Sequence, residues 1–362
     1  MKLPKLDDLI DEQKNIYFHS ENENIFVVGP PGSGKTTLAI FRAKYLIELK
    51  LNILIITRNR MLAALAKELG GDKVTSKTMH EFIASDHSKK IGSWAPNPIR
   101  YQFQWDTIIN SYANADIKPE IDHLIIDEGQ NLPSGFFRWA TIFAAKTVTV
   151  FADENQTIDP LRATIAEICA ANLPSPIRLH QNHRNTVEVA RVAEHFYHAL
   201  SKLPPGVVQK SRGGETPYLA HFNSLNDFSK QVISRYKNRG ESIGIIVYEV
   251  NEVENLFNHF KQALPAERVD SYTNESANAD AGKNLLNPGI TILSGESAIG
   301  LEFDAVFLLD LSRSLPTHNL DDYRRLYMLC SRAKTALILA TISNPLNDSQ
   351  IASLPDERIL NR

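Results

Sequence analysis

Short apolar runs alternate along the chain with longer stretches in which apolar residues recur at helical spacing. In the first half, continuous apolar runs predict buried strands at 24–28, 52–57, 123–126 and 147–152, with a further strand-like run at 74–80. Helical spacing predicts helices at 7–19, 38–49 and 61–69. Continuous apolar strands separated by helices are typical of a parallel sheet covered on both faces. The pattern therefore predicts an α/β fold with mainly parallel sheets.

The same alternation continues in the second half of the chain. Strands are predicted at 218–222, 243–248, 289–294, 305–311 and 335–341, and helices at 187–203, 225–239, 251–264 and 321–332. Two prolines in 170–176 make that segment the candidate hinge. A chain of 362 residues suits two domains of ordinary size, which we predict at 1–173 and 174–362.

Two segments are predicted to be irregular. The first, 84–120, is rich in aromatic residues such as Trp94 and Trp105, which either cap the sheet or form a partner-binding surface. The second, 270–288, is polar and rich in Asn and Asp, which predicts a loop.

A glycine-rich motif follows the first predicted strand. Residues 29–37 read GPPGSGKTT and satisfy the phosphate-loop pattern G-x-x-x-x-G-K-[ST], between a strand and a helix as that pattern requires. The glycines let backbone N–H groups point at phosphate oxygens, and the lysine and the first threonine suit the β and γ phosphates and Mg²⁺. The predicted nucleotide-binding residues of this loop are Gly29, Pro30, Gly32, Ser33, Gly34, Lys35, Thr36 and Thr37.

Polar side chains follow two further predicted strands. Asp127 and Glu128 stand at the end of one, where Asp127 can hold Mg²⁺ and Glu128 can orient and deprotonate water. Asp153 to Gln156 follow the next strand, and we assign sensing of the γ phosphate to the Gln156 amide. Because parallel strands end at one edge of a sheet, these groups are expected near the phosphate loop.

Composition sets looser limits. Charged residues make up 22% and the formal net charge is −3, so the totals show no polybasic nucleic-acid binder, although a local basic stripe would suffice for binding. Cys169 and Cys330 lie in apolar stretches and are predicted to be buried, in a reducing compartment. Residues 1–8 do not resemble a signal peptide and no run is long enough to cross a bilayer, which favours the cytoplasm and no membrane partner.

These motifs, in their order, resemble those of superfamily 1 helicases of the UvrD, Rep and PcrA type along nearly the whole chain. The matching segments are Gln13, 29–36 (phosphate loop), 78–80 (TFH), 127–130 (DExQ), 153–156 (GDxxQ), 181–184 (QNYRS), 297–303 (SAKGLEF) and 327–333 (VTRA). The resemblance implies two RecA-like P-loop NTPase domains with the nucleotide in the cleft between them, and use of ATP and Mg²⁺.

The resemblance also implies residue roles. Gln13 is expected to read adenine, His183 to stack against it, and Glu302, in the same motif as Gly300, to lie near the ribose. Arginine fingers that reach the γ phosphate from the second domain are expected at Arg184 and Arg332. Candidate contacts with a nucleic-acid backbone are Arg58, Arg60, Thr78 and His80.

Several positions depart from the family. Thr57 stands where the family has a base-stacking phenylalanine, and residues 157–161 lack its tryptophan. Each lost base–aromatic stack removes about 1–3 kcal/mol of binding. Ile299 replaces the motif lysine and His183 the motif tyrosine. The spacings between motifs also leave no room for large accessory domains, so the chain resembles a bare two-domain motor.

Two functions follow from these features. The first is a Mg²⁺-dependent ATPase motor on single-stranded DNA, moving 3′ to 5′ if directional, with RNA also open as the strand. The second is an ATPase switch or partner subunit of a larger nuclease or defence complex, which the lost stacking residues favour. A strand binder should lose affinity steeply with salt, whereas a switch that faces a protein need not.

Overall fold

The computed structural model describes residues 3–99, 102–153, 162–197, 205–208, 213–273, 281–309 and 311–362, with only the backbone at 281 and 283. These residues form two compact units, each described by itself below. The N-terminal unit takes in the described residues of Lys2–Gly29 and Gly34–Leu179, and the C-terminal unit those of His180–Arg362. Pro30–Ser33 group with the C-terminal unit by their contacts.

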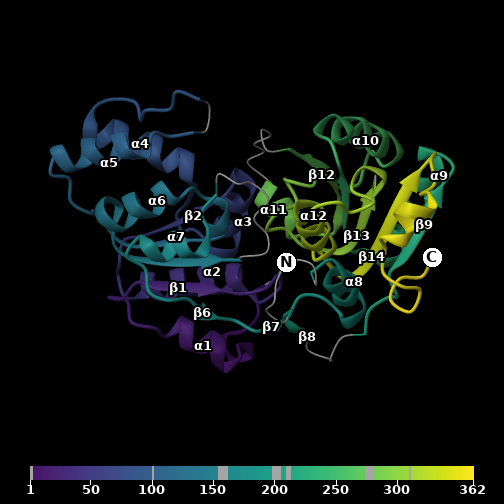
Figure 1. Ribbon diagram of the computed structural model, residues 1–362, viewed down its shortest axis with the longest axis horizontal. Coiled ribbons are helices and arrows are strands. Elements are labelled where there is room, and N and C mark those ends of the chain that lie inside the picture. The colour runs from purple at the N-terminus through teal and green to yellow at the C-terminus, as the bar shows by residue number, and fades with distance from the viewer. Residues whose placement is uncertain are drawn as a thin grey trace. The chain divides into compact units, whose positions relative to one another are not determined.

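A six-stranded parallel sheet forms the centre of the N-terminal unit (Figure 1). Its strands are β1 (Ile25–Val28), β2 (Ile53–Thr57), β3 (Ser76–Thr78), β4 (Ile121–Ile126), β5 (Ala145–Ala152) and β6 (Ile177–Arg178). They lie in the order β3-β2-β4-β5-β1-β6. The middle strands β1, β4 and β5 all end beside the segments that carry the predicted site residues.

Helices cover both faces of this sheet, because successive strand residues point to opposite sides. Phe26 and Val28 face a core shared with α4 (Met79–Ile91), α5 (Trp105–Asn114), α6 (Ser134–Trp139) and α7 (Ile165–Ala170). Ile25 and Val27 face the opposite core, shared with α1 (Asp11–Tyr17) and α2 (Lys35–Glu48). Helix α3 (Arg60–Gly70) packs beside α2 and β2. Short turns of helix lie at Leu6–Asp8, Gly129–Asn131 and Ala140–Ala144.

The prediction that 84–120 is irregular is wrong. Helix α4 runs from Met79 to Ile91, with the Thr78 hydroxyl accepting from the Glu81 N–H at 3.2 Å as its N-cap. In α5, Ile108 and Tyr112 are fully buried one turn apart. Phe103 and Trp105 pack against the same core, so at least these aromatics cap the sheet.

A second parallel sheet forms the C-terminal unit. It contains β9 (Tyr218–Phe222), β10 (Ser242–Val247), β11 (Val269–Tyr272), β12 (Gly289–Ser294), β13 (Phe303–Leu309) and β14 (Ala333–Ile342), in the order β11-β12-β10-β13-β14-β9. Helices α9 (Leu225–Arg239) and α10 (Val250–Ala263) share the core on one face. Helices α8 (Val187–Tyr197) and α12 (Leu320–Cys330) pack against each other and against β14.

Smaller elements complete the C-terminal unit. Strands β7 (Gln181–Asn182) and β8 (Val207–Val208) pair in parallel, and short helices lie at Ala281–Leu285 (α11), Leu311–Arg313 and Asp348–Ala352 (α13). The loop predicted for 270–288 is therefore partly wrong. Its polar residues Asp270 and Ser271 belong to an edge strand that is ordered by pairing with β12, which composition does not reveal.

The α/β class with parallel sheets is thus confirmed, and most strands and helices lie within a few residues of their predicted ranges. Cys330 is buried as expected, whereas Cys169 is only half-buried, because α7 is short and lies at the surface. The last strand of the N-terminal sheet, β6, pairs with β1 beyond the predicted hinge, through Val27 and Ile177. The predicted domain boundary itself stays a prediction.

A buried histidine makes the stability of the N-terminal unit depend on pH. His123 on β4 is fully buried, and its Nε2 lies 2.7 Å from the Thr149 hydroxyl. Burial and the positive charge of Arg42 lower the pKa of His123 to about 3. An unfolded histidine has a pKa of about 6.5, so it binds a proton in the unfolded state well before it does so in the native state.

We therefore expect His123 to remove stability as the pH falls below about 6.5, at a cost of about 2 kcal/mol between pH 7 and pH 5. Urea unfolding at both pH values measures it, in the wild type and in His123→Gln. The variant should lose less stability on acidification, since a neutral amide does not titrate. Equal losses in the two proteins would show that His123 does not control this dependence.

Candidate nucleotide site

The phosphate loop connects β1 to α2. Gly34 is the N-cap of α2 with φ +88°, and Gly32 has φ +78°, a left-handed backbone that favours glycine. Lys35 is the first residue of the helix, and its Nζ donates to the Gly29 carbonyl at 2.7 Å. The same Nζ lies 3.6 Å from Asp153 Oδ2. Of the other predicted loop residues, Ser33 is buried, and Pro30, Thr36 and Thr37 are half-buried.

The two predicted metal ligands are in direct contact. The Thr36 hydroxyl donates to Asp127 Oδ2 at 2.7 Å. The second oxygen, Asp127 Oδ1, is buried and accepts no hydrogen bond from the part of the chain that the structure describes. Burial, followed by the nearby charge of Glu128, holds the pKa of Asp127 well above its usual range. A hydroxyl beside an unsatisfied carboxylate oxygen fits Mg²⁺, which prefers oxygen ligands and would relieve this crowding of negative charge.

Glu128 is fixed next to this pair. Its backbone is left-handed at φ +56°, which is strained for a residue with a side chain. Gln130 donates from Nε2 to Glu128 Oε2 at 2.6 Å, and its Oε1 accepts from the Asp153 N–H at 2.9 Å. Gln130 thus connects the end of β4 to the end of β5. Sequence reasoning gave it no role, although it is the last residue of the DExQ match.

Gln13 lies beside Gly34, at the end of the phosphate loop. It is in the first turn of α1, and its Oε1 accepts from the Ile10 N–H at 3.3 Å. Its Nε2 lies 2.8 Å from the point where a Cβ would stand at Gly34. The fold therefore brings this glutamine to the end of the phosphate loop, and a larger residue at position 34 would displace it. Gln156 lies outside the described residues.

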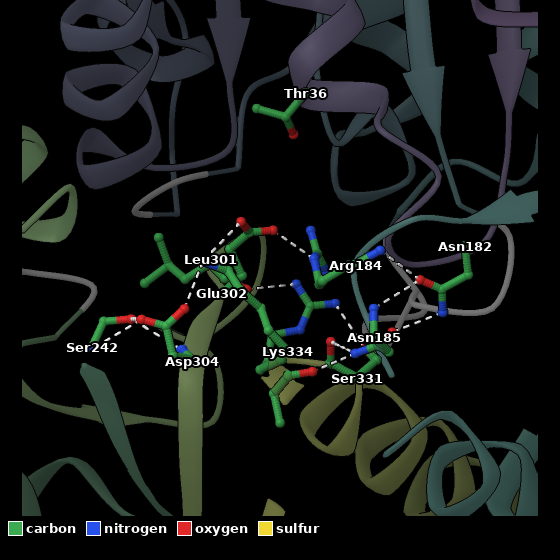
Figure 2. A network of polar contacts seen from close by, with 12 residues as sticks. Thr36, Asn182, Arg184, Asn185, Ser242, Leu301, Glu302, Asp304, Ser331 and Lys334 are labelled. Carbon is green, nitrogen blue, oxygen red and sulfur yellow. Dashed lines mark hydrogen bonds and ion pairs between the residues drawn. The ribbon is translucent and has the colours of Figure 1, made fainter. Parts of the chain in front are cut away.

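A polar network in the C-terminal unit joins three predicted motifs (Figure 2). Arg184 Nε donates to Glu302 Oε2 at 2.6 Å, and Lys334 Nζ lies 3.5 Å from Glu302 Oε1 and 3.3 Å from Asp304 Oδ1. Burial by itself raises the pKa of Glu302, but the charges of Arg184 and Lys334 outweigh it and hold the pKa below its usual value. Glu302 is therefore ionised. Lys334 and Asp304 were not singled out by sequence reasoning.

Arg332 is fully buried within the same unit. It donates from Nε to the Met328 carbonyl at 2.9 Å, from NH1 to the Leu301 carbonyl at 3.3 Å, and from NH2 to the Ser331 hydroxyl at 3.2 Å. These contacts fix the segment after α12 against the segment before β13.

Asn185 binds that segment to the Arg184 motif. Its Nδ2 donates to the Ser331 carbonyl at 3.0 Å and also to the Ala333 carbonyl (Figure 2). The two predicted fingers are therefore held on adjoining segments of one unit. Gly300 is buried with φ +81°, and His183 is half-buried.

The predicted nucleic-acid residues lie around α3 and α4. Arg58 is half-buried and Arg60, the first residue of α3, is exposed. Thr78 is buried and caps α4, so its hydroxyl already has a structural role. His80 is half-buried and stacks on Phe103, with ring centroids 5.4 Å apart.

A parallel α/β sheet with a phosphate loop after β1, and with two acids after β4 of the same sheet, is typical of P-loop nucleotide-binding proteins. Family comparisons agree with this class: a model described as an AAA domain matches residues 13–161. The model of the viral superfamily 1 RNA helicase core domain matches residues 102–341, more than half of the chain. The chain belongs to this superfamily 1 helicase family, and the predicted superfamily is confirmed.

Other comparisons are more distant. No curated protein sequence matches the chain. Among solved structures, the C-terminal domain of a possible DNA helicase from Lactobacillus strain WCFS1 is similar at 20% identity and a TM-score of 0.36, over 49% of this chain and 96% of that domain. A likeness at that TM-score says nothing about function. None of the described helices is both long and apolar enough to cross a membrane.

Proposed function

We propose that this helicase-type nucleotide hydrolase uses ATP and Mg²⁺ and acts on single-stranded DNA, with 3′ to 5′ movement if it is directional. The observation that carries the proposal is the contact of Thr36 with Asp127, next to Lys35 on one side and Glu128 on the other. The candidates for the phosphate-binding lysine, the two metal ligands and the general base all belong to one unit, which supports the proposal. The UvrD-type assignment, the domains at 1–173 and 174–362, and a cytoplasmic location belong to the same proposal.

The residues of the N-terminal unit would divide the chemistry among themselves. Thr36 and Asp127 would hold Mg²⁺, which neutralises charge on the β and γ phosphates when it is bound. Lys35 would exchange the Gly29 carbonyl and Asp153 for phosphate oxygens. Glu128, held by Gln130, would orient the attacking water and accept its proton. Gln13 would read the adenine edge, since an amide both donates and accepts.

The residues of the C-terminal unit would stabilise the transition state. We propose that Arg184 and Arg332 reach the γ phosphate, with Gln156 sensing it from the N-terminal side. For this, Arg184 must exchange Glu302 for a phosphate oxygen, and Arg332 must give up carbonyl partners. Glu302 would then be available to the ribose, with His183 and Gly300 near the nucleoside.

The proposed strand contacts lie around α3 and α4. Arg60 is exposed and the stacked ring of His80 is partly accessible, which suits phosphate and base contacts. Arg58 and Thr78 complete the proposed set. Because the matching family model is described as an RNA helicase core, RNA is a direct competitor as the strand.

One observation favours the second function, an ATPase switch or partner subunit of a nuclease or defence complex. Thr57, at the position of the family's stacking phenylalanine, is 1% exposed, and its hydroxyl donates to the Asn59 carbonyl at 3.1 Å. Thr57 therefore has neither a ring nor an accessible surface on which a base could stack, which lowers the affinity for a nucleic-acid strand at this position.

Steady-state ATP hydrolysis with and without single-stranded DNA or RNA tests the proposal, with Lys35→Ala as the blank. We expect hydrolysis that DNA stimulates several-fold, that falls steeply with salt because phosphate contacts release counterions, and that the blank lacks. Stimulation by RNA alone would replace DNA by RNA as the strand. Robust hydrolysis that neither strand changes would contradict the motor function and favour the switch.

A further inference from the structure

Arg42 is a fully buried arginine in the middle of α2, the helix that begins with the phosphate-loop lysine. Its guanidinium donates to four carbonyls that follow one another closely in the chain, with the NH1 and NH2 groups doing the donating. The acceptors are the carbonyls of Ile16 at 3.2 Å, Tyr17 at 3.4 Å, His19 at 3.0 Å and Ser20 at 2.9 Å. The remaining nitrogen, Nε, donates to the Thr149 hydroxyl on β5 at 3.2 Å.

The Thr149 hydroxyl extends this contact to His123. The Glu21 carbonyl, 3.3 Å from His123 Nδ1, can only accept, so the neutral imidazole carries its proton on Nδ1. His123 Nε2 then accepts from the Thr149 hydroxyl, 2.7 Å away, while Thr149 Oγ1 accepts from Arg42 Nε. The hydrogen bonds that link Arg42, Thr149, His123 and Glu21 thus run in one direction, from α2 through β5 and β4 to residue 21. The segment 16–21 has five of its six carbonyls bound by Arg42 or His123.

Residues 16–21 run from the last two residues of α1 into the connection to β1. The last carbonyls of a helix have no partner within the helix, and a positive charge there also favours the helix dipole. Arg42 supplies the hydrogen-bond donors and the positive charge at the C-terminal end of α1, and Gln13 lies near the start of the same helix. A helix that is held at its C-terminal end is fixed in direction, so Arg42 controls where Gln13 lies.

Arg42 and the phosphate-binding residues also share a helix. Lys35 and Arg42 are seven residues apart on α2, which is about two turns, so they lie on the same side of one rigid element. The distance from the Gln13 amide to Lys35 and Thr36 therefore depends on the contacts of Arg42. We infer that Arg42, through Thr149 and His123, is a positioning residue that sets the selectivity of this site for adenine nucleotides. This inference rests on the proposed function.

Stability alone is a poor account of Arg42. The guanidinium is held by four backbone carbonyls and one hydroxyl, and the negative charge of Glu21 also favours its protonated form. Removing the guanidinium would leave these carbonyls without their donor and cost stability, but a lysine would keep the charge and supply three donors of its own. An arginine fork that fits four carbonyls in a fixed geometry suits the orientation of a backbone segment.

The test compares wild type, Arg42→Lys, Thr149→Val and Gln13→Ala in the full chain. Lysine keeps the charge but loses the fork, and valine keeps the shape of threonine but removes the hydroxyl that links Arg42 to His123. Lys44→Ala, a half-buried position on the same helix, is the control. For each protein, kcat/KM is measured with ATP and with GTP, and inorganic triphosphate is titrated as a competitor that has no base.

We expect the wild type to prefer ATP, and Arg42→Lys and Gln13→Ala each to lower the ATP-to-GTP ratio by about tenfold, the scale of one bidentate amide contact with a base. Thr149→Val should lower it less. Affinity for inorganic triphosphate should be the same in the wild type and in every variant, because the proposed phosphate contacts do not involve Gln13. Thermal unfolding of each variant shows that it is folded at the assay temperature.

Each other outcome has a definite meaning. If Gln13→Ala lowers the ratio and the two network variants do not, the inference about Arg42 is wrong while the proposed function stands. If Arg42→Lys weakens triphosphate as much as ATP, Arg42 supports the whole loop and not selectivity. If the wild type hydrolyses neither nucleotide, the proposed function fails instead.

Discussion

Replacing Glu128 by glutamine should lower kcat for ATP hydrolysis by about 10²- to 10⁴-fold and leave ATP affinity nearly unchanged. Glutamine has the size of glutamate but cannot accept the proton of the attacking water. The groups proposed to bind the nucleotide, Lys35 and the Thr36–Asp127 pair, keep their contacts in this variant. The loss should therefore appear in kcat, with KM close to that of the wild type.

The contacts of Glu128 suggest how to read this experiment. Gln130 donates to the carboxylate that is changed, and it can donate equally to the new amide oxygen, so the left-handed turn at Glu128 should survive. Glu120→Gln is the matched control, since Glu120 is an exposed acid of the same unit that pairs only with Lys89 among the described residues. A Glu128→Gln variant that retains more than a tenth of the wild-type kcat would exclude Glu128 as the general base.

Much of the fold could be predicted because its signals are local. The parallel strands are continuous apolar runs, and β1 is followed at once by the loop that its motif requires. The regions that were missed lack such signals. Helix α5 contains only two fully buried residues, and β11 is a short edge strand with two polar residues at its centre that is ordered by pairing with β12.

The same division applies to the site. Lys35, Thr36, Asp127 and Glu128 could be named as candidates because each belongs to a short motif, and the structure brings Thr36 and Asp127 into contact. Positioning residues carry no motif. Arg42 reads in the sequence as one charged residue in a helix, and only the path of residues 16–20 shows that it is surrounded by carbonyls. Burial of Arg332 against carbonyls of its own unit is equally invisible in the sequence.

Replacing Arg184 by alanine should lower kcat by about 10³- to 10⁵-fold, the range known for arginine fingers in phosphoryl transfer. A finger acts on charge that develops in the transition state, so the loss should again fall on kcat. Arg184→Lys should recover part of the rate, because it keeps the charge and loses the planar fork. Arg191→Ala, at an exposed position on α8 of the same unit, should have no effect.

The ion pair with Glu302 gives this prediction a rival explanation. Removing Arg184 leaves the carboxylate of Glu302, which is 14% exposed, with Lys334 at 3.5 Å as its remaining charged partner among the described residues. A loss of activity could thus come from a displaced Glu302 and not from a missing finger. Measuring Arg184→Ala in a Glu302→Gln background separates the two, because glutamine has no charge to leave unpaired. If Arg184 is a finger, alanine lowers kcat by the same factor in both backgrounds. If the factor shrinks to near one with Glu302→Gln, Arg184 serves only to hold Glu302 in place.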